Sequence, residues 1–173
     1  MKSEGPSSTS AEIDSLTFRK ACGQFMTGVT IVTTIDQKTG PAGLAANSFT
    51  SVSLDPPLVL ISVDRGANSL RALESSGRYA VHILGAHQED LCRRFAKSDL
   101  SGTEKLEGVS WTPGMGGVPL LDDYLVRFEC RVVNAVPGGD HVIYLAEVER
   151  LDFEETEAAA LGFFRGAYLR SPG

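Results

Sequence analysis

The feature that most constrains the fold is a series of short segments rich in β-branched and aromatic residues, separated by turns too short to hold a helix. The segments are VTIVTT, AGLAANSFTSVSL, LVLISV and YAVHIL from Val29 onward, followed by residues 125–136, 141–153 and 161–169. Such segments predict strands, and short links favour antiparallel neighbours because parallel strands need a long crossover. The sequence therefore predicts a mainly β protein whose antiparallel sheet closes into a small barrel.

A few helices are expected on the outside of this barrel. Apolar residues at helical spacing predict a helix over residues 15–26, capped by Asp14 or Ser15, and two short helices over residues 68–75 and 88–96. Residues 98–117, which contain Trp111 and the sequence PGMGG, are expected to form a loop. The sequence PGGD at residues 137–140 predicts a hairpin turn between the two longest strands.

Length and composition favour one folded unit. The chain has 173 residues, of which 42% are hydrophobic and 22% charged, and this fits a single domain over residues 15–173 preceded by a disordered tail over residues 1–14. Some strands, notably residues 142–146, are apolar on both faces. We therefore expect a partner subunit to cover one face in a homodimer.

Charge and cysteine content exclude several classes of protein. A formal net charge of -6 argues against binding to nucleic acid or to an anionic membrane surface. The longest apolar run, LVLI at residues 58–61, is far shorter than the ~20 residues of a membrane span, and the N-terminus lacks an apolar signal segment. The three cysteines are odd in number and far apart, so neither a disulfide framework nor a metal site is expected, and a reducing cytoplasm fits best.

The cysteines and one histidine are expected to have structural roles and no catalytic role. Cys22, Cys92 and Cys130 lie on apolar faces of their segments and are expected to be small core residues. His82, within YAVHIL, is expected to be a hydrogen-bonded histidine of the core or of an interface. Walker, Rossmann, HExxH and GxSxG signatures are absent from the sequence, so a nucleotide would be held in another way.

Residues 43–57 form the segment richest in small and polar side chains. Small residues allow a flat ligand to approach the backbone, and the side chains of Asn47, Ser48, Thr50, Ser51 and Ser53 offer hydrogen bonds to a ring edge and a polyol chain. These properties suit a flavin. The alternative is an edge strand with a solvated hydroxyl face before the two prolines.

Two further features point to a nucleotide. Arg93, Arg94 and Lys97 lie close together at the end of a predicted helix, where they could hold a phosphate or merely complement the helix dipole. His141 follows the predicted hairpin turn and is expected to face a cleft, where imidazole can bond or stack against a ring. A purely structural histidine is the alternative.

Five segments in matching order resemble the flavin reductase family, the reductase components of two-component flavin-dependent monooxygenases. They are FMTGVTIVT at residues 25–33, NSFTSVSLDPPLVL at 47–60, HQEDLCRRFA at 87–96, GDH at 139–141 and FRGAY at 164–168. The resemblance implies an antiparallel split β-barrel that binds FMN and is normally dimeric. It also implies an enzyme that uses NADH or NADPH to reduce FMN or FAD and supplies the reduced flavin to a partner monooxygenase.

The resemblance further implies which residues contact the cofactors. The flavin ring and ribityl chain would be contacted by Thr27, Gly28, Val29, Ala46, Asn47, Ser48, Phe49, Thr50, Ser51, Val52 and Ser53, and the phosphate end by Arg93, Phe95, Ala96 and Lys97. His141 would contact the nicotinamide nucleotide, and Arg165 and Tyr168 would lie near the ligand cleft. No acid or base is expected, because hydride transfer from nicotinamide C4 to flavin N5 depends mainly on orientation.

Other functions stay open at this stage. The same barrel could bind or store flavin without turnover, could be an oxidase of the pyridoxamine-phosphate type, or could bind an apolar ligand. FMN and FAD, NADH and NADPH, and the identity of the partner oxygenase are alternatives between which the sequence does not choose.

Overall fold

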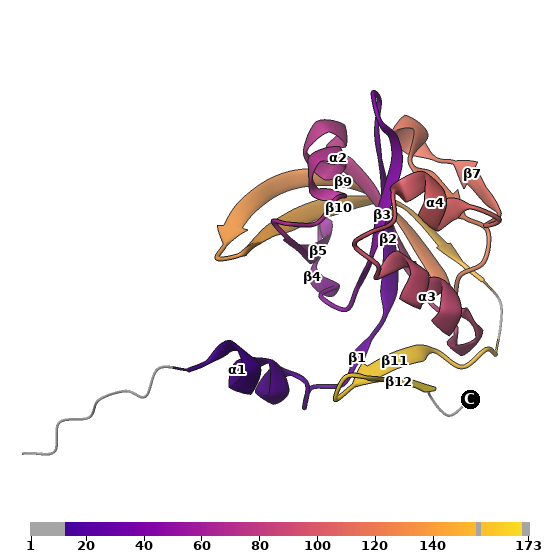
Figure 1. The fold of residues 1–173 in the computed structure, drawn as a ribbon. Coiled ribbons are helices and arrows are strands. Elements are labelled where there is room, and N and C mark those ends of the chain that lie inside the picture. Colours follow the sequence, from indigo (N-terminus) through magenta and orange to yellow (C-terminus); the bar gives the residue numbers. More distant parts are fainter. Residues whose placement is uncertain (1–12, 155–156, 171–173) are drawn as a thin grey trace, which may run out of the picture.

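The computed structural model describes residues 13–154 and 157–170, which form an antiparallel β structure flanked by short helices (Figure 1). The helices are α1 (Ser15–Cys22), α2 (Leu70–Ser76), α3 (Glu89–Phe95) and α4 (Gly102–Leu106), with 3₁₀ turns η1 (Ala86–Gln88) and η2 (Met115–Gly117). The strands are β1 (Thr27–Gly28), β2 (Thr30–Asp36), β3 (Gly40–Ala46), β4 (Thr50–Leu54), β5 (Pro57–Asp64), β6 (Arg78–Ile83), β7 (Trp111–Pro113), β8 (Pro119–Leu121), β9 (Val126–Gly138), β10 (His141–Phe153), β11 (Leu161–Phe164) and β12 (Ala167–Arg170). The predicted tail over residues 1–14 lies almost wholly outside the described residues.

The main sheet has seven strands in the order β3-β2-β6-β9-β10-β5-β4, and every pairing is antiparallel. Its two edge strands, β3 and β4, follow one another in the chain and are joined by residues 47–49. The prediction of a closed barrel is wrong in one respect: within the described residues no ladder hydrogen bonds join β3 to β4. This open seam is consistent with a split barrel, so the antiparallel split-barrel class is confirmed.

The β9–β10 hairpin is the longest pairing in the fold and extends from the body as an arm (Figure 1). Its second strand has the predicted bounds, His141–Phe153, and the turn falls at the predicted glycines. Alternate residues Val142, Tyr144 and Ala146 are buried, while Ile143 and Leu145 are half-buried. A period-2 burial pattern on an apolar strand leaves one face packed on the core and the other partly open.

Two apolar clusters make up most of the core. The first fills the inside of the sheet and includes Val32, Ile61, Tyr79 and Tyr144. The second lies under α3 and β11 and includes Ile31, Leu84, Cys92, Phe95 and Leu161. Cys92 and Cys130 are buried, as predicted.

His82 lies on β6 with no exposed surface and connects two strands. Its Nδ1 is 3.1 Å from the Ile31 carbonyl oxygen, and its Nε2 accepts a hydrogen bond from the Leu121 N–H at 3.0 Å. Burial lowers the pKa of His82 to about 3, so the ring is neutral, donating from Nδ1 and accepting at Nε2. The prediction of a hydrogen-bonded core histidine is confirmed.

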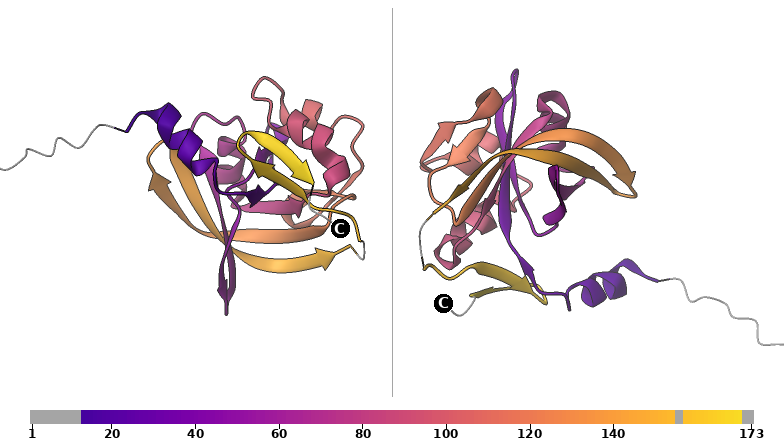
Figure 2. Two further views of the ribbon diagram at one scale, coloured as in Figure 1. Left: turned by 90° about the horizontal axis from the view of Figure 1, so that it is seen from below. Right: turned by 180° about the vertical axis from the view of Figure 1, so that it is seen from behind.

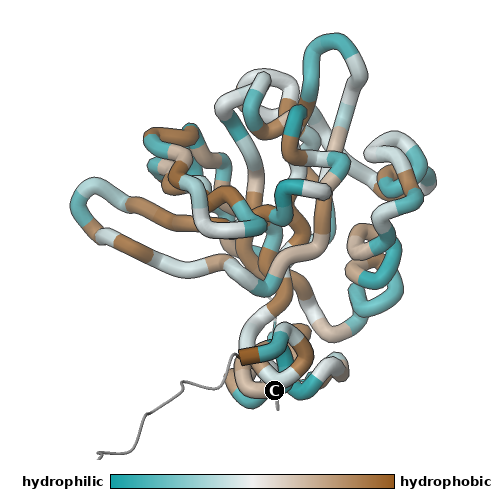
Figure 3. The backbone as a smooth tube through the Cα atoms, turned by 60° about the vertical axis from the view of Figure 1, so that its left-hand side comes forward, coloured by the Kyte–Doolittle hydropathy of each residue, from teal (hydrophilic) through white to brown (hydrophobic). Residues whose placement is uncertain are grey.

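Helix α1 is shorter and more exposed than predicted. Asp14 is the N-cap, since its side chain accepts hydrogen bonds from the N–H groups of Leu16 and Thr17, but the helix ends at Cys22 instead of Met26. None of its residues is buried, and Cys22 is exposed, so the prediction that Cys22 is a core residue is wrong. Figures 2 and 3 show α1 standing away from the sheet, next to β1, and carrying hydrophobic positions.

Three other segments differ from the prediction: two contain a turn that was not predicted, and one contains a helix and a strand that were not predicted. The run expected as one strand over residues 42–54 breaks at residues 47–49 into β3 and β4. The expected final strand is a hairpin, β11–β12, whose turn residues Arg165 and Gly166 have positive φ values of 50° and 80°. The expected loop over residues 98–117 contains helix α4 and strand β7.

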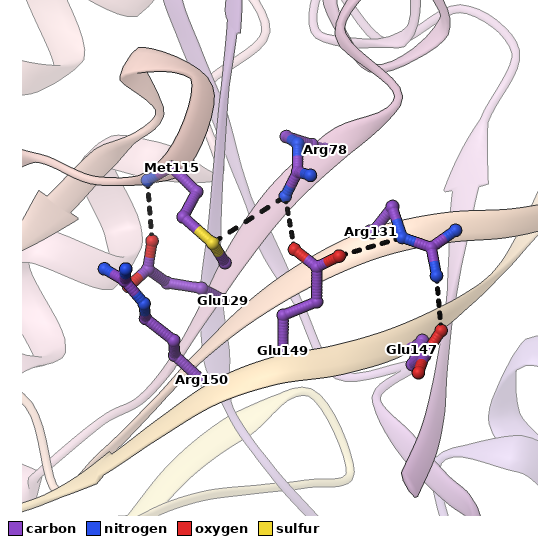
Figure 4. A network of polar contacts seen from close by, with 7 residues as sticks. All are labelled: Arg78, Met115, Glu129, Arg131, Glu147, Glu149 and Arg150. Carbon is purple, nitrogen blue, oxygen red and sulfur yellow. Dashed lines mark hydrogen bonds and ion pairs between the residues drawn. The ribbon is translucent and has the colours of Figure 1, made fainter. Parts of the chain in front are cut away.

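A network of charged side chains covers part of the outer face of β6, β9 and β10 (Figure 4). Glu149 accepts hydrogen bonds from Arg78 at 2.5 Å and from Arg131 at 2.8 Å, and Arg131 also pairs with Glu147. Nearby, the Oε2 atom of the buried Glu129 accepts a hydrogen bond from the Met115 N–H at 2.7 Å. These contacts tie three neighbouring strands and turn η2 together.

Within the described residues, no helix combines the length and apolar character needed to cross a membrane.

Candidate functional site

A cavity of about 1150 Å³ lies beside the seam, between the β9–β10 turn on one side and helices α3 and α4 on the other. It is larger than the roughly 300–1,000 Å³ typical of small-molecule sites. It is lined by Ser15, Phe18, Arg19, Cys22, Leu44, Ala45, Ala46, Asn47, Ser48, Ser62, Asp64, Gly66, Ala67, Asn68, Ser69, Phe95, Ala96, Lys97, Ser98, Lys105, Gly138, Asp140 and His141. A cleft of this size, with apolar walls and a few polar groups, suits a nucleotide.

The link between β3 and β4 is held against the neighbouring strand by one side chain. Ser48 Oγ donates a hydrogen bond to the Ser62 carbonyl oxygen at 2.9 Å and accepts one from the Ser62 N–H at 3.0 Å. A paired contact of this kind fixes both the position and the rotamer of the serine. Asn47, which is exposed next to it, is thereby presented at the cavity.

The segment before α2 contributes an unsatisfied hydroxyl. Asn68 Nδ2 donates a 2.6 Å hydrogen bond to the Ser98 carbonyl oxygen, which joins this segment to the end of α3. Ser69 is only 3% exposed, and its Oγ has no hydrogen-bond partner among the described residues. Its side chain does not cap α2. A buried hydroxyl without a partner costs free energy, so a ligand that bonds to it gains affinity.

The β9–β10 turn brings His141 to the cavity, together with two carboxylates. His141 Nδ1 lies 2.7 Å from Asp140 Oδ1, and this interaction lowers the pKa of Asp140. Asp64 is the register partner of His141 across β5 and β10. The Arg65 guanidinium is directed to the same turn, where its Nε donates to the Gly139 carbonyl oxygen at 3.0 Å. This corner therefore offers one imidazole and two carboxylates to a ligand.

Some of the site residues predicted from the sequence meet at this cavity. They come from the end of β3 and the link after it, from the end of α3, and from the start of β10: Ala46, Asn47, Ser48, Phe95, Ala96, Lys97 and His141. Phe95 is buried and supplies an apolar wall, while Lys97 is exposed at the end of α3. The predicted segments that are far apart in sequence thus contribute to one cleft.

A second set lies on β4 and the residue before it. Thr50, Ser51 and Val52 are exposed on this edge strand, Ser53 is half-buried, and Phe49 packs against Phe128 with ring centroids 5.3 Å apart. None of these residues is among those that line the cavity in the described structure. This half of the polar segment has the features of the alternative interpretation, a solvated edge strand.

The remaining predicted residues gather around the C-terminal hairpin. Thr27 and Gly28 pair with Phe163 and Gly162 in β11, and Val29 is buried in the second core cluster. The Arg165 Nε donates to Gln24 Oε1 at 2.8 Å, just beyond α1. These residues stand beside the cavity-lining helix α1 without lining the cavity themselves in the described structure.

Arg93 belongs to this hairpin group, and not to the cavity. Its guanidinium binds Glu89 at 2.7 Å and lies 4.5 Å from the centroid of the Tyr168 ring. Tyr168 in turn has its hydroxyl 3.4 Å from the Cys92 sulfur, and its pKa is raised to about 12, mainly by burial. Arg93 thus already has an anion and an aromatic partner, which leaves Lys97 as the one predicted phosphate-end cation that lines the cavity.

The sequence prediction missed several lining residues. Phe18, Arg19 and Cys22 reach the cavity because α1 lies beside it, and Ser69 and Lys105 reach it from loops and a short helix. The DRGANS sequence at residues 64–69, which places a turn directly after an apolar strand, was the available signal for Ser69. Lys105 lies in the segment 98–117, for which the sequence predicts a loop, and nothing in that segment indicates a buried lysine.

The chemistry of these groups fits a flavin nucleotide. The orphan Ser69 hydroxyl and the cations Lys97 and Lys105 can bond to phosphate oxygens, while Phe18, Leu44, Ala46 and Phe95 offer apolar contact to a ring. Among residues 13–154 and 157–170, no group of three or more His, Cys, Asp or Glu side chains is arranged to hold a metal ion.

A split barrel with a nucleotide-sized cleft at its seam defines a flavin-binding class of protein. The chain belongs to the family described as flavin reductase like domain, whose model matches residues 22–171. A curated relative is the HsaB reductase subunit of a flavin-dependent monooxygenase from Mycobacterium tuberculosis, 38% identical over 160 residues, which cover 92% of this chain and 83% of that protein. The FMN reductase (NADH) SmoA of Agrobacterium fabrum is 39% identical over 157 residues, covering 91% and 86% of the two chains.

The fold agrees with a solved structure of the same kind. The NADH:FAD oxidoreductase SgcE6 of Streptomyces globisporus, in complex with NAD and FAD fragments, superposes with a TM-score of 0.84 at 36% identity. The match covers 94% of this chain and 98% of that one. Sequence and fold therefore place the chain in one family along nearly its whole length.

Proposed function

We propose that this protein is an NAD(P)H:flavin oxidoreductase that reduces FMN or FAD and supplies the reduced flavin to a partner flavin-dependent monooxygenase. The observation that carries the proposal is the cavity at the seam, which is lined by Ser48, the cations Lys97 and Lys105, and His141. The cavity lies in a chain that belongs to the flavin reductase family. The names of two relatives support FMN and FAD as candidate flavins and NADH as a candidate reductant: one relative is an NADH-dependent FMN reductase and the other is an NADH:FAD oxidoreductase.

The chain's own contribution to the reaction is positioning. When bound, nicotinamide supplies a hydride from its C4 atom and flavin accepts it at N5, a reaction that needs the two rings in contact and water kept out. Ser48 fixes the link that borders the flavin, and Phe18, Leu44 and Phe95 provide apolar walls. His141, held by Asp140, is the proposed contact to the nicotinamide nucleotide. No acid or base residue is assigned.

We also propose that two copies of the chain associate through α1 and the residues around it. One short segment carries five large apolar side chains that are each at least 60% exposed: Ile13, Leu16, Phe18, Phe25 and Met26. Clustered apolar side chains of this size mark interaction sites more often than solvated surface. Because α1 also lines the cavity, a partner packed on it would narrow the cavity entrance.

The remaining assignments follow from composition. We propose one domain over residues 15–173, supported by a family model that covers residues 22–171. Three free cysteines support a reducing compartment such as the cytoplasm, and a net charge of -6 supports small-molecule and protein partners over nucleic acid.

The test is anaerobic oxidation of NADH and of NADPH, followed by absorbance with no flavin, with FMN and with FAD, against flavin-only controls. The proposal predicts multiple turnovers that increase with added flavin. A single stoichiometric bleaching of bound flavin would instead favour the flavin-storage alternative. No oxidation with any flavin would overturn the reductase assignment.

A further inference from the structure

Lys105 is a buried cation that no part of the proposed mechanism yet uses. It lies on α4, is 5% exposed and lines the cavity. Its Nζ donates one hydrogen bond, to the Gly43 carbonyl oxygen at 3.1 Å. In the part of the chain that the structure describes, no carboxylate lies within ion-pair distance of it.

The surrounding structure holds this side chain firmly in place. Ser101 caps α4 and exchanges hydrogen bonds with Glu104, so the short helix is fixed at its start. Gly102 lies directly on β3, where a Cβ atom would come within 2.0 Å of the Pro41 carbonyl oxygen. Only glycine permits this approach. The Lys105 stem therefore emerges from a helix seated on the edge strand beside the seam.

The Lys105 ammonium group has fewer hydrogen bonds than it can form, and it has no ion-pair partner among the described residues. The ammonium group has three donors, and one neutral carbonyl satisfies only one of them. Burial lowers the pKa of Lys105, and the Asp99 carboxylate, in the segment before α4, opposes that effect without forming an ion pair. A buried charge without a counter-ion costs free energy, which an anion in the adjoining cavity would offset.

The neighbouring donors narrow the chemistry of that anion. The Ser69 hydroxyl is unpartnered and nearly fully buried, and the Asn68–Ser98 hydrogen bond brings its segment against the loop that carries Lys97. Two ammonium groups and a hydroxyl on one cavity match a phosphate, which has several acceptor oxygens and up to two negative charges. A single carboxylate would leave most of these donors unused.

We propose that Lys105 is the buried anchor for a phosphate group of the nucleotide that occupies the cavity. The inference rests on the proposed function and deepens it, because that function brings two phosphate-bearing nucleotides to the site. The phosphate belongs either to the flavin nucleotide or to the nicotinamide dinucleotide. Arg93, one of the two cations predicted from the sequence for the phosphate end, contacts Glu89 and Tyr168 and does not line the cavity in the described structure.

The test compares ligands that differ only in phosphate. Flavin fluorescence titrations give the dissociation constants of FMN and of riboflavin for the wild type, Lys105→Met and Lys105→Gln. The Met variant removes charge and donors, and the Gln variant keeps a donor without charge. If Lys105 binds the flavin phosphate, FMN binding should weaken about tenfold or more in both variants, while riboflavin binding changes less than about twofold.

A second arm identifies the source of the phosphate. KM values for NADH and for reduced nicotinamide riboside, which lacks phosphate, are compared in the same variants. A loss confined to NADH assigns the phosphate to the nicotinamide dinucleotide, and a loss confined to FMN assigns it to the flavin. Lys38→Met, in the exposed β2–β3 turn, is the matched control and should change none of these values.

Two results would overturn the proposal. Equal weakening of FMN and riboflavin would mean that Lys105 only supports β3, and unchanged affinity for all four ligands would mean that it contacts no phosphate. Circular dichroism and thermal melting confirm folding of each variant, and Lys105→Gln replaces Lys105→Met if the latter does not fold. Failure of the proposed function is separate, since the wild type would then bind no flavin and oxidise no reduced nicotinamide, which overturns both proposals.

Discussion

His141 lies directly opposite Asp64 in the antiparallel pairing of β5 with β10, and both residues border the cavity. The His141 Nδ1 atom is also 2.7 Å from Asp140 Oδ1, so the neighbouring turn residue holds the imidazole in place. A side chain held in this way can orient a neutral ring or amide without itself reacting. This relationship makes His141 the residue whose replacement best tests nicotinamide binding.

Replacing His141 with alanine should raise the apparent KM for NADH or NADPH by about tenfold and leave the KM for flavin nearly unchanged. Loss of one contact made equally in the ground and transition states has this effect. His87→Ala is the matched control, because His87 pairs with Asp123 on an exposed surface outside the lining of the cavity. Unchanged nicotinamide kinetics in the His141 variant would remove its assigned role.

Replacing Ser48 with alanine should weaken FMN binding and lower the free energy of unfolding by about 1–2 kcal/mol, because both hydrogen bonds to the Ser62 backbone are lost. Ser51→Ala, on the exposed edge strand β4, should do neither. Flavin titration and urea unfolding measure the two effects. Equal weakening in both variants would show that β4 contacts the flavin as closely as the link does.

His82 should make the protein acid-sensitive. The pKa of His82 is about 3 in the folded protein and about 6.5 in the unfolded chain. Between these pH values His82 is therefore protonated in the unfolded chain and neutral in the folded protein. Stability due to this group is complete above pH 6.5 and falls by roughly 1 kcal/mol per pH unit as the pH decreases toward 3. His82→Gln keeps a donor and an acceptor without titrating.

Urea unfolding of the wild type and of His82→Gln, measured at pH 7, 6, 5 and 4, tests this prediction. The variant should be less stable at pH 7 by about 1–3 kcal/mol, because amide geometry cannot reproduce both contacts. Its stability should then decline less steeply with falling pH. Parallel declines for the two proteins would contradict the assignment.

Replacing Leu16 with aspartate should shift the protein from dimer to monomer, because it places a charge in the exposed apolar segment around α1. Thr17→Asp adds the same charge to the same helical turn at a polar position and should leave the dimer intact. Sedimentation equilibrium of both variants at several concentrations gives the association constants. A wild type that is monomeric throughout would overturn the dimer proposal.

The sequence predicted the β9–β10 hairpin well because two long apolar strands flank an unmistakable turn. It failed where a single side chain or dihedral decides the path of the chain. Ser48 bonds to β5 where the run of residues 42–54 is interrupted, and the positive φ values at Arg165 and Gly166 turn one expected strand into a hairpin. The interruption at Ser48 depends on a partner that is distant in sequence, and the turn at Arg165 and Gly166 depends on backbone geometry.

The candidate site was predictable only in part, for a similar reason. Ala46, Ser48 and His141 follow apolar strands at turns, where residues reach a cleft, and this position is visible in the sequence. Lys105 is different, because lysine is normally exposed and only the close packing of Gly102 on β3 buries it. The contact of Arg93 with Tyr168 was not visible in the sequence, because Tyr168 lies on a strand more than 70 residues away.

The open seam between β3 and β4 also bears on how a ligand leaves. In a closed barrel, widening the wall would break a ladder of backbone hydrogen bonds between β3 and β4. Among the described residues no such ladder exists, and the link between these strands is held by the Ser48 contacts to Ser62 and by the packing of Phe49 on Phe128. A small widening at the seam therefore breaks no ladder hydrogen bond between β3 and β4. Exchange of a flavin at the seam, as the proposed function would require, could then take place while the hydrogen-bonded sheet stays intact.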